Sequence, residues 1–120
     1  MKLYNQTRGA VLAERAELAE RPLARMKGLL GRDRLAQGEA LIIKPCTSIH
    51  TFFMRFAIDV LFLDKQGHVL RAIDTLRPWR MSRIYPRAAC VAELPAGTLS
   101  RTATSEGDMV LLSPDGAARI

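Results

Sequence analysis

The stretch Pro45–Asp64, with the sequence PCTSIHTFFMRFAIDVLFLD, is the most apolar and most aromatic part of the chain. Three of the four Phe residues lie within Phe52–Phe56. A strand that is apolar on both faces is typical of a protein core, where every polar group needs a partner. The polar side chains embedded in this stretch, His50, Arg55 and Asp59, are therefore the first candidates for a functional site.

Length and composition predict the class of protein. The 120 residues predict one domain, 1–120, with its core at about 10–112 and a frayed tail at 113–120. Hydrophobic residues make up 48% and charged residues 25%, a balance that suits a globular chain and argues against disorder. The formal net charge of +6 is compatible with an anionic partner but does not require one.

Cysteine content and hydropathy bear on the cellular compartment. The two cysteines, Cys46 and Cys90, are too few for a disulfide scaffold, and we expect both to be reduced and buried. The sequence after Met1 contains no apolar run of signal-peptide length and no stretch long enough to span a membrane. We therefore expect a cytoplasmic protein with no membrane partner.

Residues 10–30 combine strand and helix signals. Ala, Leu and Glu favour a helix up to residue 20, but Pro22 belongs in the first turn of a helix and not in its middle. We therefore predict an extended piece near Gly9–Ala16 and a helix near Glu20–Leu30. The alternative is one longer helix that begins at Val11. The apolar stripe of the predicted helix consists of Leu23, Met26 and Leu30.

Beyond residue 38 the composition favours β structure. Asp64–Gly67 lies between two apolar runs and predicts a hairpin loop with its glycine in the left-handed position. Short strands, Gly-marked turns and one main helix predict an α+β fold. Its sheet is expected to be small, mostly antiparallel and strongly bent or closed like a barrel. The predicted strands are Leu3–Asn5, Ala40–Lys44, Ile49–Met54, Ile58–Leu63, Val69–Ile73, Cys90–Leu94 and Met109–Leu112.

Two cysteines and two histidines raise the question of a zinc site. The four residues are Cys46, His50, His68 and Cys90, and their spacing does not match the usual zinc-finger patterns. In an extended chain, Cys46 and His50 would lie roughly 13 Å apart. A zinc ion holds each of its ligands within roughly 2.3 Å. We therefore expect no metal and no cofactor.

His50 and Asp59 also raise the question of catalysis. His50 is either a core histidine bonded to a backbone carbonyl or a general base that titrates near neutral pH. Arg55 and Asp59 are either a structural ion pair or a recognition pair. Paired in this way, a buried ionised Asp59 would have a depressed pKa. Neither a G-x-S-x-G elbow nor a papain-like Cys context accompanies these residues.

The segment Arg77–Arg87 is basic, contains no acidic residue and includes two aromatic residues. Arginines beside exposed aromatic side chains are typical of proteins that bind single-stranded nucleic acid. The alternative is a solvated loop whose tryptophan packs on the sheet, and neither an RNP1 nor a KH GXXG signature is present. The candidate contacts for nucleic acid or another anion are Arg77, Trp79, Arg80 and Arg83.

Four motifs together resemble a known family. They are GLLGR at Gly28–Arg32, IHTFFMRFAIDVLFLD at Ile49–Asp64, LPAGT at Leu94–Thr98 and EGD at Glu106–Asp108. This pattern resembles domain of unknown function family 192, a group of small bacterial and archaeal proteins. The resemblance implies a compact β-rich domain with a helix before the first core strand, and it implies no activity.

The sequence therefore favours a small binding module for an anionic small molecule or a peptide. The predicted site residues are His50, Met54, Arg55 and Asp59. The first alternative is an enzyme, for example a hydrolase, that uses His50 as a base and Asp59 to orient it. The second alternative is a module that binds nucleic acid or a protein partner through Arg77–Arg87.

Overall fold

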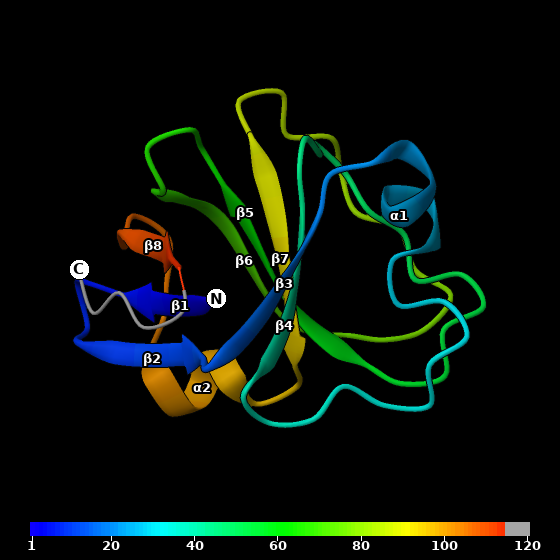
Figure 1. Cartoon of the computed structure of the whole chain (residues 1–120), viewed down its shortest axis with the longest axis horizontal. Helices are drawn as coiled ribbons and strands as arrows, with labels where there is room; N and C mark the ends of the chain where they lie inside the picture. Colours follow the sequence, from blue (N-terminus) through cyan, green and yellow to red (C-terminus); the bar gives the residue numbers. More distant parts are fainter. Residues whose placement is uncertain (115–120) are drawn as a thin grey trace.

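A computed structural model describes residues 1–114 of the chain. These residues form two β-sheets and two short helices, which confirms the predicted α+β class (Figure 1). The elements are β1 (Lys2–Asn5), β2 (Ala10–Ala13), β3 (Arg15–Ala19), α1 (Pro22–Lys27), β4 (Glu39–Ile43), β5 (Ile58–Leu63), β6 (Val69–Leu76), β7 (Cys90–Pro95), α2 (Thr98–Thr102) and β8 (Val110–Ser113).

The described strands are divided between a five-stranded and a three-stranded sheet. The larger sheet has the order β3-β4-β7-β5-β6, and the smaller has the order β2-β1-β8. Only β3 and β4 pair in parallel, and all other described pairs of strands are antiparallel. The mostly antiparallel arrangement was predicted, but these sheets do not close into the barrel that we expected.

The predicted hairpin joins β5 to β6. Leu61 lies opposite Ala72 in the antiparallel register. The side chain of Asp64 holds the loop, because its Oδ1 accepts hydrogen bonds from the backbone N–H groups of Gln66 and His68, both at 2.9 Å. Gly67 has φ 96°, and a Cβ atom there would overlap the backbone carbonyl oxygen of Val110 in β8. Both the conformation and the close approach of β8 require glycine at this position.

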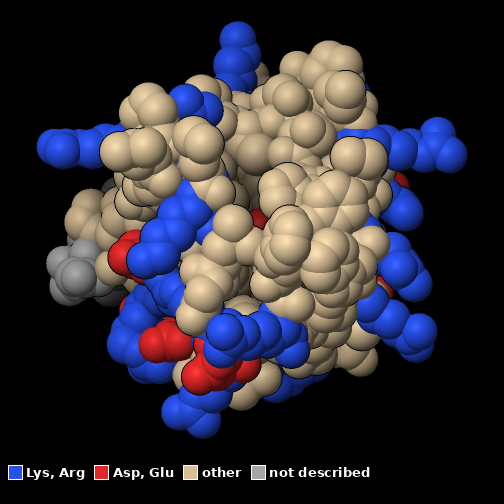
Figure 2. Space-filling view, turned by 90° about the vertical axis from the view of Figure 1, so that its right-hand side faces the viewer, with Lys and Arg blue, Asp and Glu red and all other residues tan. Residues whose placement is uncertain are grey.

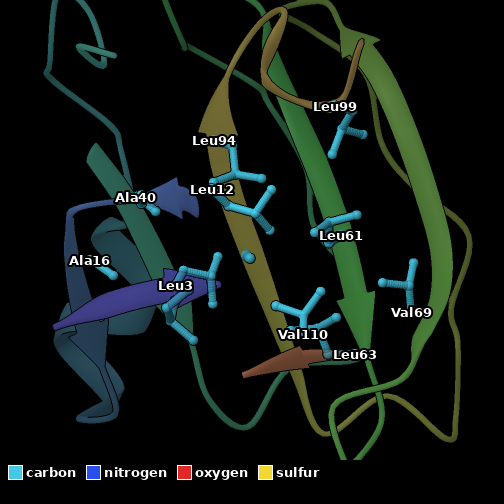
Figure 3. Close-up of a cluster of buried hydrophobic side chains, with 13 residues drawn as sticks. Leu3, Leu12, Ala16, Ala40, Leu61, Leu63, Val69, Leu94, Leu99 and Val110 are labelled. Carbon is cyan, nitrogen blue, oxygen red and sulfur yellow. The ribbon is translucent and has the colours of Figure 1, made fainter. Parts of the chain in front are cut away.

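One side of the five-stranded sheet packs against the three-stranded sheet and α2, and we call it the closed face. The side chains of Leu3 from β1 and Val110 from β8 meet those of Leu61, Leu63 and Leu94 in this core (Figure 3). These five side chains are between 0% and 5% exposed. Secondary structure therefore removes these five side chains from water, although a hollow of about 260 Å³ remains beside three of them, Leu3, Leu63 and Val110.

The other side of the same sheet is covered by α1 and by long loops, and we call it the open face. Figure 1 shows α1 and these loops on the side of the sheet opposite the three-stranded sheet. Val60, Phe62 and Val91 point to this side and are fully buried. The ring of Phe62 lies 4.5 Å from that of Tyr85, which the loop after β6 supplies. Because β5 is covered on both faces, its near-continuous apolar sequence is explained.

The predicted helix is shorter than expected and packs differently. Pro22 occupies its first turn, as predicted, and residues 10–19 form β2 and β3 instead of the longer helix. Every residue of α1 is at least partly exposed, and Leu23 and Met26 are 80% and 74% exposed. Two of the three residues of the apolar stripe therefore face solvent, and the third, Leu30, packs against the core. The helical composition of 15–19 is overridden because β3 pairs along its whole length with β4.

The predicted strand at Ile49–Met54 is wrong. His50 forms an isolated bridge with Met81, and the rest of the segment is a loop. Buried Thr51 explains this conformation, since it bonds the 77–81 loop instead of a neighbouring strand. Its N–H donates to the carbonyl of Arg80 at 2.8 Å, and its Oγ1 donates to the carbonyl of Arg77 at 2.6 Å.

The two ends of the described chain lie in the smaller sheet. We expected a frayed tail to begin at residue 113, but Ser113 is paired with Lys2 in the smaller sheet. The rest of the predicted tail, residues 115–120, lies outside the described part of the chain. Leu3 is 1% exposed, so buried core extends closer to the N-terminus than residue 10. Neither of the helices within residues 1–114 has the length and apolar character that crossing a membrane requires.

Candidate functional site

A cavity of about 360 Å³ lies between α1 and the open face, and we call it the α1 cavity. Its walls come from residues 22–30, from the loop at 45–50 and from Met54, and Glu93 of β7 lies at its inner end. Leu29, Ile43 and Met54 supply an apolar lining, while Arg25 and Lys27 bring positive charge. An apolar cavity with a few converging polar groups is the usual form of a small-molecule site.

Glu93 is a buried carboxyl group in the middle of the five-stranded sheet. It lies opposite Leu41 on one side and Val60 on the other, and it is 3% exposed. Burial raises the pKa of Glu93 to about 7, although the positive charge of Arg32 lowers it in part. The Oε1 atom of Glu93 has no hydrogen-bond partner within the described residues. Such a group is costly to bury, and a ligand that bonded it would remove part of that cost.

Arg25 brings an unpartnered donor to the same cavity. Its Nη1 donates to the backbone carbonyl of Pro45 at 3.1 Å, which anchors α1 to the 45–50 loop. Its Nε is buried and has no hydrogen-bond partner in the described part of the chain. Arg25 and Glu93 do not form an ion pair with each other, although both line the cavity. A donor and an acceptor are therefore both left for a third group.

Cys46 and His50 lie at the side of the cavity. Cys46 Sγ donates to the carbonyl of Ser48 at 3.0 Å, and burial raises the pKa of its thiol. The group is therefore not an activated thiolate nucleophile. Cys90 is also free, and both cysteines are half-buried, not fully buried as expected.

His50 is exposed, which corrects the prediction of a core histidine. Its ring stacks on that of Phe52 with 5.0 Å between centroids, and its Nδ1 accepts the N–H of Phe52 at 3.2 Å. The structure thus places His50 and Met54 on the α1 cavity, and it places two other predicted site residues elsewhere. Arg55 is 65% exposed and forms an ion pair with Asp33.

Asp59 lies away from the α1 cavity and holds α2. Its Oδ1 accepts the N–H of Thr75 at 2.8 Å, and its Oδ2 accepts those of Gly97 at 3.1 Å and Leu99 at 2.9 Å. The predicted pair of Asp59 with Arg55 is wrong, because these backbone donors satisfy both oxygens. For the same reason Asp59 does not orient His50, so the predicted base and orienter are not assembled.

The expected direction of the Asp59 pKa is also wrong. The side chain is fully buried, as predicted, and burial raises the pKa of its carboxyl group. The hydrogen bonds from Leu99, Thr75 and Gly97 lower the pKa but do not cancel the effect of burial. A raised pKa means that ionised Asp59 weakens the fold as pH rises above the ordinary value of 3.8, the opposite of the expected trend.

The residues considered for zinc are not gathered into a metal site. Cys46 and His50 line the α1 cavity, whereas His68 pairs with Met109 at the hairpin. Within residues 1–114, no group of three or more His, Cys, Asp and Glu side chains is arranged to hold a metal ion.

The basic segment at 77–87 is tied to the loop that borders the cavity. Trp79 is 55% exposed, and its ring centroid lies 4.6 Å from that of Phe53. The backbone N–H of Trp79 donates to the carbonyl of Thr51 at 3.0 Å. Arg77, Arg80 and Arg83 are all exposed. The tryptophan therefore does not pack into the core, and its segment extends the surface around the cavity.

Known structures show the same fold. A crystal structure of a protein of unknown function from Novosphingobium aromaticivorans superposes with a TM-score of 0.81 at 22% identity, covering 93% of this chain and 84% of that one. The crystal structure of a putative transcription regulator from Sinorhizobium meliloti superposes with a TM-score of 0.75 at 25% identity, covering 92% and 89%. The chain thus shares its α+β fold with these two solved structures.

Sequence comparison gives the family. Residues 3–112 match DUF192, described as "Uncharacterized ACR, COG1430", and the chain belongs to this family. A UPF0127 protein of Pyrococcus abyssi is 33% identical over 114 residues, which cover 90% of this chain and 94% of the relative. A UPF0127 protein of Thermococcus sibiricus is 31% identical over 112 residues, which cover 90% and 72%. The predicted family resemblance is confirmed.

Proposed function

We propose that this protein is a binding module whose α1 cavity takes an anionic group on an apolar body, either a small molecule or part of a peptide. The observation that carries the proposal is the pair of unpartnered buried atoms in one cavity, Arg25 Nε and Glu93 Oε1. A buried polar group without a partner costs free energy, and a ligand that supplies the partner recovers it.

Arg25 is the natural anchor for the anion. Its Nε–H is a free donor of a charged group, and hydrogen bonds between a guanidinium and an anion are stronger than those between neutral groups. Lys27, which also lines the cavity, adds a second positive charge. An acidic ligand group beside them is therefore favoured over a neutral group of the same shape.

Glu93 completes the site when it is protonated. With a pKa of about 7, a substantial fraction of this carboxyl group carries a proton near neutral pH and can donate it in a hydrogen bond. The ligand anion then accepts from both Arg25 and Glu93. The apolar part of the ligand lies against Leu29, Ile43 and Met54, which gain from the removal of water.

Octanoate is a suitable probe, because it combines one carboxylate with a short apolar chain. Titration calorimetry near pH 6 should show that octanoate binds more tightly than octanamide, which has the same shape without the charge. Arg25→Gln should weaken octanoate binding by about tenfold or more, the effect of one charged hydrogen bond.

The matched control is Arg21→Gln, which removes a charge from the exposed residue just before α1 that does not line the cavity. This variant should bind octanoate as the wild type does. The proposal fails if octanoate and octanamide bind equally well, or if Arg25→Gln and Arg21→Gln have the same effect.

A further inference from the structure

The surface around the α1 cavity exposes large apolar side chains, and we call it the α1 face. Six such side chains are between 55% and 80% exposed within residues 1–114: Leu23, Met26, Phe53, Trp79, Met81 and Ile84. They come from α1, from the 50–54 loop and from the 77–84 loop. Scattered exposed apolar residues are ordinary, but six on three neighbouring segments indicate a binding surface.

These three segments lie side by side. The bridge between His50 and Met81 joins the two loops, and the contact between the rings of Phe53 and Trp79 extends it. His50 and α1 both line the α1 cavity, which joins the helix to the loops. Figure 2 shows this side of the molecule as a broad uncharged surface with Lys and Arg along much of its border.

The charge on the α1 face is mainly positive, although buried Glu93 lines its cavity and Asp33 pairs with Arg55. Segments 21–32, 40–58 and 75–92 contain ten of the 18 Lys and Arg residues and none of the 12 Asp and Glu residues. A second copy of this chain would set like charges against each other, because a symmetric pair places the same surface on both sides. The complementary partner is therefore acidic, with apolar groups to cover the six exposed side chains.

The shape of the α1 face selects among acidic partners. A second hollow of about 640 Å³, between residues 48–50 and 81–84, shares Ser48, Ile49 and His50 with the α1 cavity. The two hollows border the same three residues, and we call the pair the groove of the α1 face. Two adjoining hollows suit an extended chain, whereas a flat bilayer would leave both unfilled. Four of the six apolar side chains are aliphatic, whereas single-stranded nucleic acid stacks on aromatic rings.

We propose that this groove binds an extended segment of a partner protein in which apolar residues are flanked by Asp and Glu. The inference builds on the proposed function, since one anionic or apolar group of the segment enters the α1 cavity. The remaining apolar side chains of the segment lie on Trp79, Met81 and Ile84, and its carboxylates lie near the surrounding arginines. Exposed Trp, Met and Arg are the residue types that are enriched at protein–protein interfaces.

The test is a selection from a displayed library of random peptides of about sixteen residues. It is run in parallel on the wild type and on a variant with Trp79→Ser, Met81→Ser and Ile84→Ser, whose three residues are exposed. Peptides enriched on the wild type should combine apolar residues with Asp and Glu. When synthesised and titrated, they should bind the variant at least about tenfold more weakly.

Charge is tested separately from apolar contact. Arg80→Glu with Arg83→Glu should weaken the selected peptides by about tenfold, because like charges then face each other. The matched control reverses two exposed cations outside the α1 face, Lys65→Glu with Arg101→Glu, and should bind them as the wild type does. Octanoate should bind the variant with Trp79→Ser, Met81→Ser and Ile84→Ser as tightly as it binds the wild type. This result would show that the variant is folded. It would also separate peptide binding by the groove from the proposed binding of an anion in the α1 cavity.

Three results would overturn the inference. One is that no peptide is enriched on the wild type over the variant. Another is that the enriched peptides lack acidic residues. The third is that phosphatidylserine vesicles or oligothymidine bind the wild type more tightly than the selected peptides do, which would assign the α1 face to a membrane or to nucleic acid.

Discussion

The closed and open faces of the five-stranded sheet carry similar apolar side chains but differ in what covers them. On the closed face, a second sheet and α2 cover Leu61 and Leu94 completely. On the open face, α1 and loops cover Val60 and Val91 but leave the α1 cavity beside Glu93. The closed face also has a hollow, of about 260 Å³, but among the described residues only the hollow of the open face is lined by a buried carboxyl group without a partner.

The difference is clearest in the two buried acids of the sheet. Asp59 accepts three backbone hydrogen bonds where β5 begins, so its position is structural. Glu93 is equally buried, yet one of its oxygens has no partner among the described residues. A buried polar group without a partner calls for an explanation, and the neighbouring cavity offers one.

The largest effect should follow loss of the Asp59 carboxylate. Asp59→Ala leaves the backbone N–H groups of Thr75, Gly97 and Leu99 without their acceptor. We expect the free energy of unfolding at neutral pH to fall by about 3–4 kcal/mol, since each buried unsatisfied group costs about 1–3 kcal/mol. Urea denaturation measures this change.

The control is Asp74→Ala. Asp74 is exposed and bonds only the hydroxyl group of the adjacent Thr75 among the contacts described. Its loss should change the free energy of unfolding by less than about 0.5 kcal/mol. If Asp59→Ala were as stable as the wild type, the carboxylate of Asp59 would not be needed to hold α2 on the closed face. The contrast between the structural Asp59 and the unpartnered Glu93 would then disappear.

The second effect is the loss of unfolding free energy when the buried carboxyl group of Glu93 ionises. Its pKa is raised from 4.5 to about 7, so the unfolding free energy of the wild type should fall as pH rises through this interval. The total fall is about 3 kcal/mol at most. Glu93→Gln does not ionise, so its stability relative to the wild type should be greater near pH 8 than near pH 5.

The measurement is urea denaturation of both proteins at the two pH values. Glu14→Gln, at an exposed position, should show no such pH-dependent gain. An equal difference between wild type and Glu93→Gln at both pH values would mean that Glu93 is ionised throughout, and that the open face does not hold a strained acid.

Most of the strands could be predicted from sequence because β-rich runs and turn residues mark them, but their division into two sheets could not. The hairpin at 64–67 needed only local signals, namely a glycine between two apolar runs. β3 was harder, because Arg15–Ala19 has helical composition and becomes a strand only beside β4. The 49–54 loop was misassigned for a related reason, since Thr51 bonds residues far away in the sequence.

The candidate site was predicted only in part. Of the four proposed site residues, His50 and Met54 line the α1 cavity, and their role in binding stays a prediction. Asp59 was recognised as buried but not as the cap of α2. Glu93 was missed, although the same reasoning about an acid inside an apolar strand applies to it. The sequence could not predict that Arg25 Nε lacks a hydrogen-bond partner, because this depends on how α1 is placed over the open face.

A smaller effect should be seen in ligand binding. If octanoate binds best when Glu93 is protonated, its affinity should fall by about tenfold between pH 6 and pH 8, in proportion to the protonated fraction of a group with a pKa of about 7. Glu93→Gln should remove this dependence, because its amide donates at both pH values. Calorimetric titrations of both proteins check this, and an affinity of the wild type that did not change would separate Glu93 from ligand binding.

The smallest effect should come from the exposed residues of α1. Leu23→Gln with Met26→Gln replaces side chains that are 80% and 74% exposed, and glutamine has a similar helix propensity. The free energy of unfolding should therefore change by less than about 0.5 kcal/mol. Leu29→Ala, at a buried position that follows the same helix, should cost about 2–4 kcal/mol by urea denaturation. A loss of more than about 1 kcal/mol in the double variant would mean that α1 packs on the sheet through Leu23 and Met26 in solution. The open face would then be closed like its counterpart, and neither the cavity nor the groove would be available to a ligand.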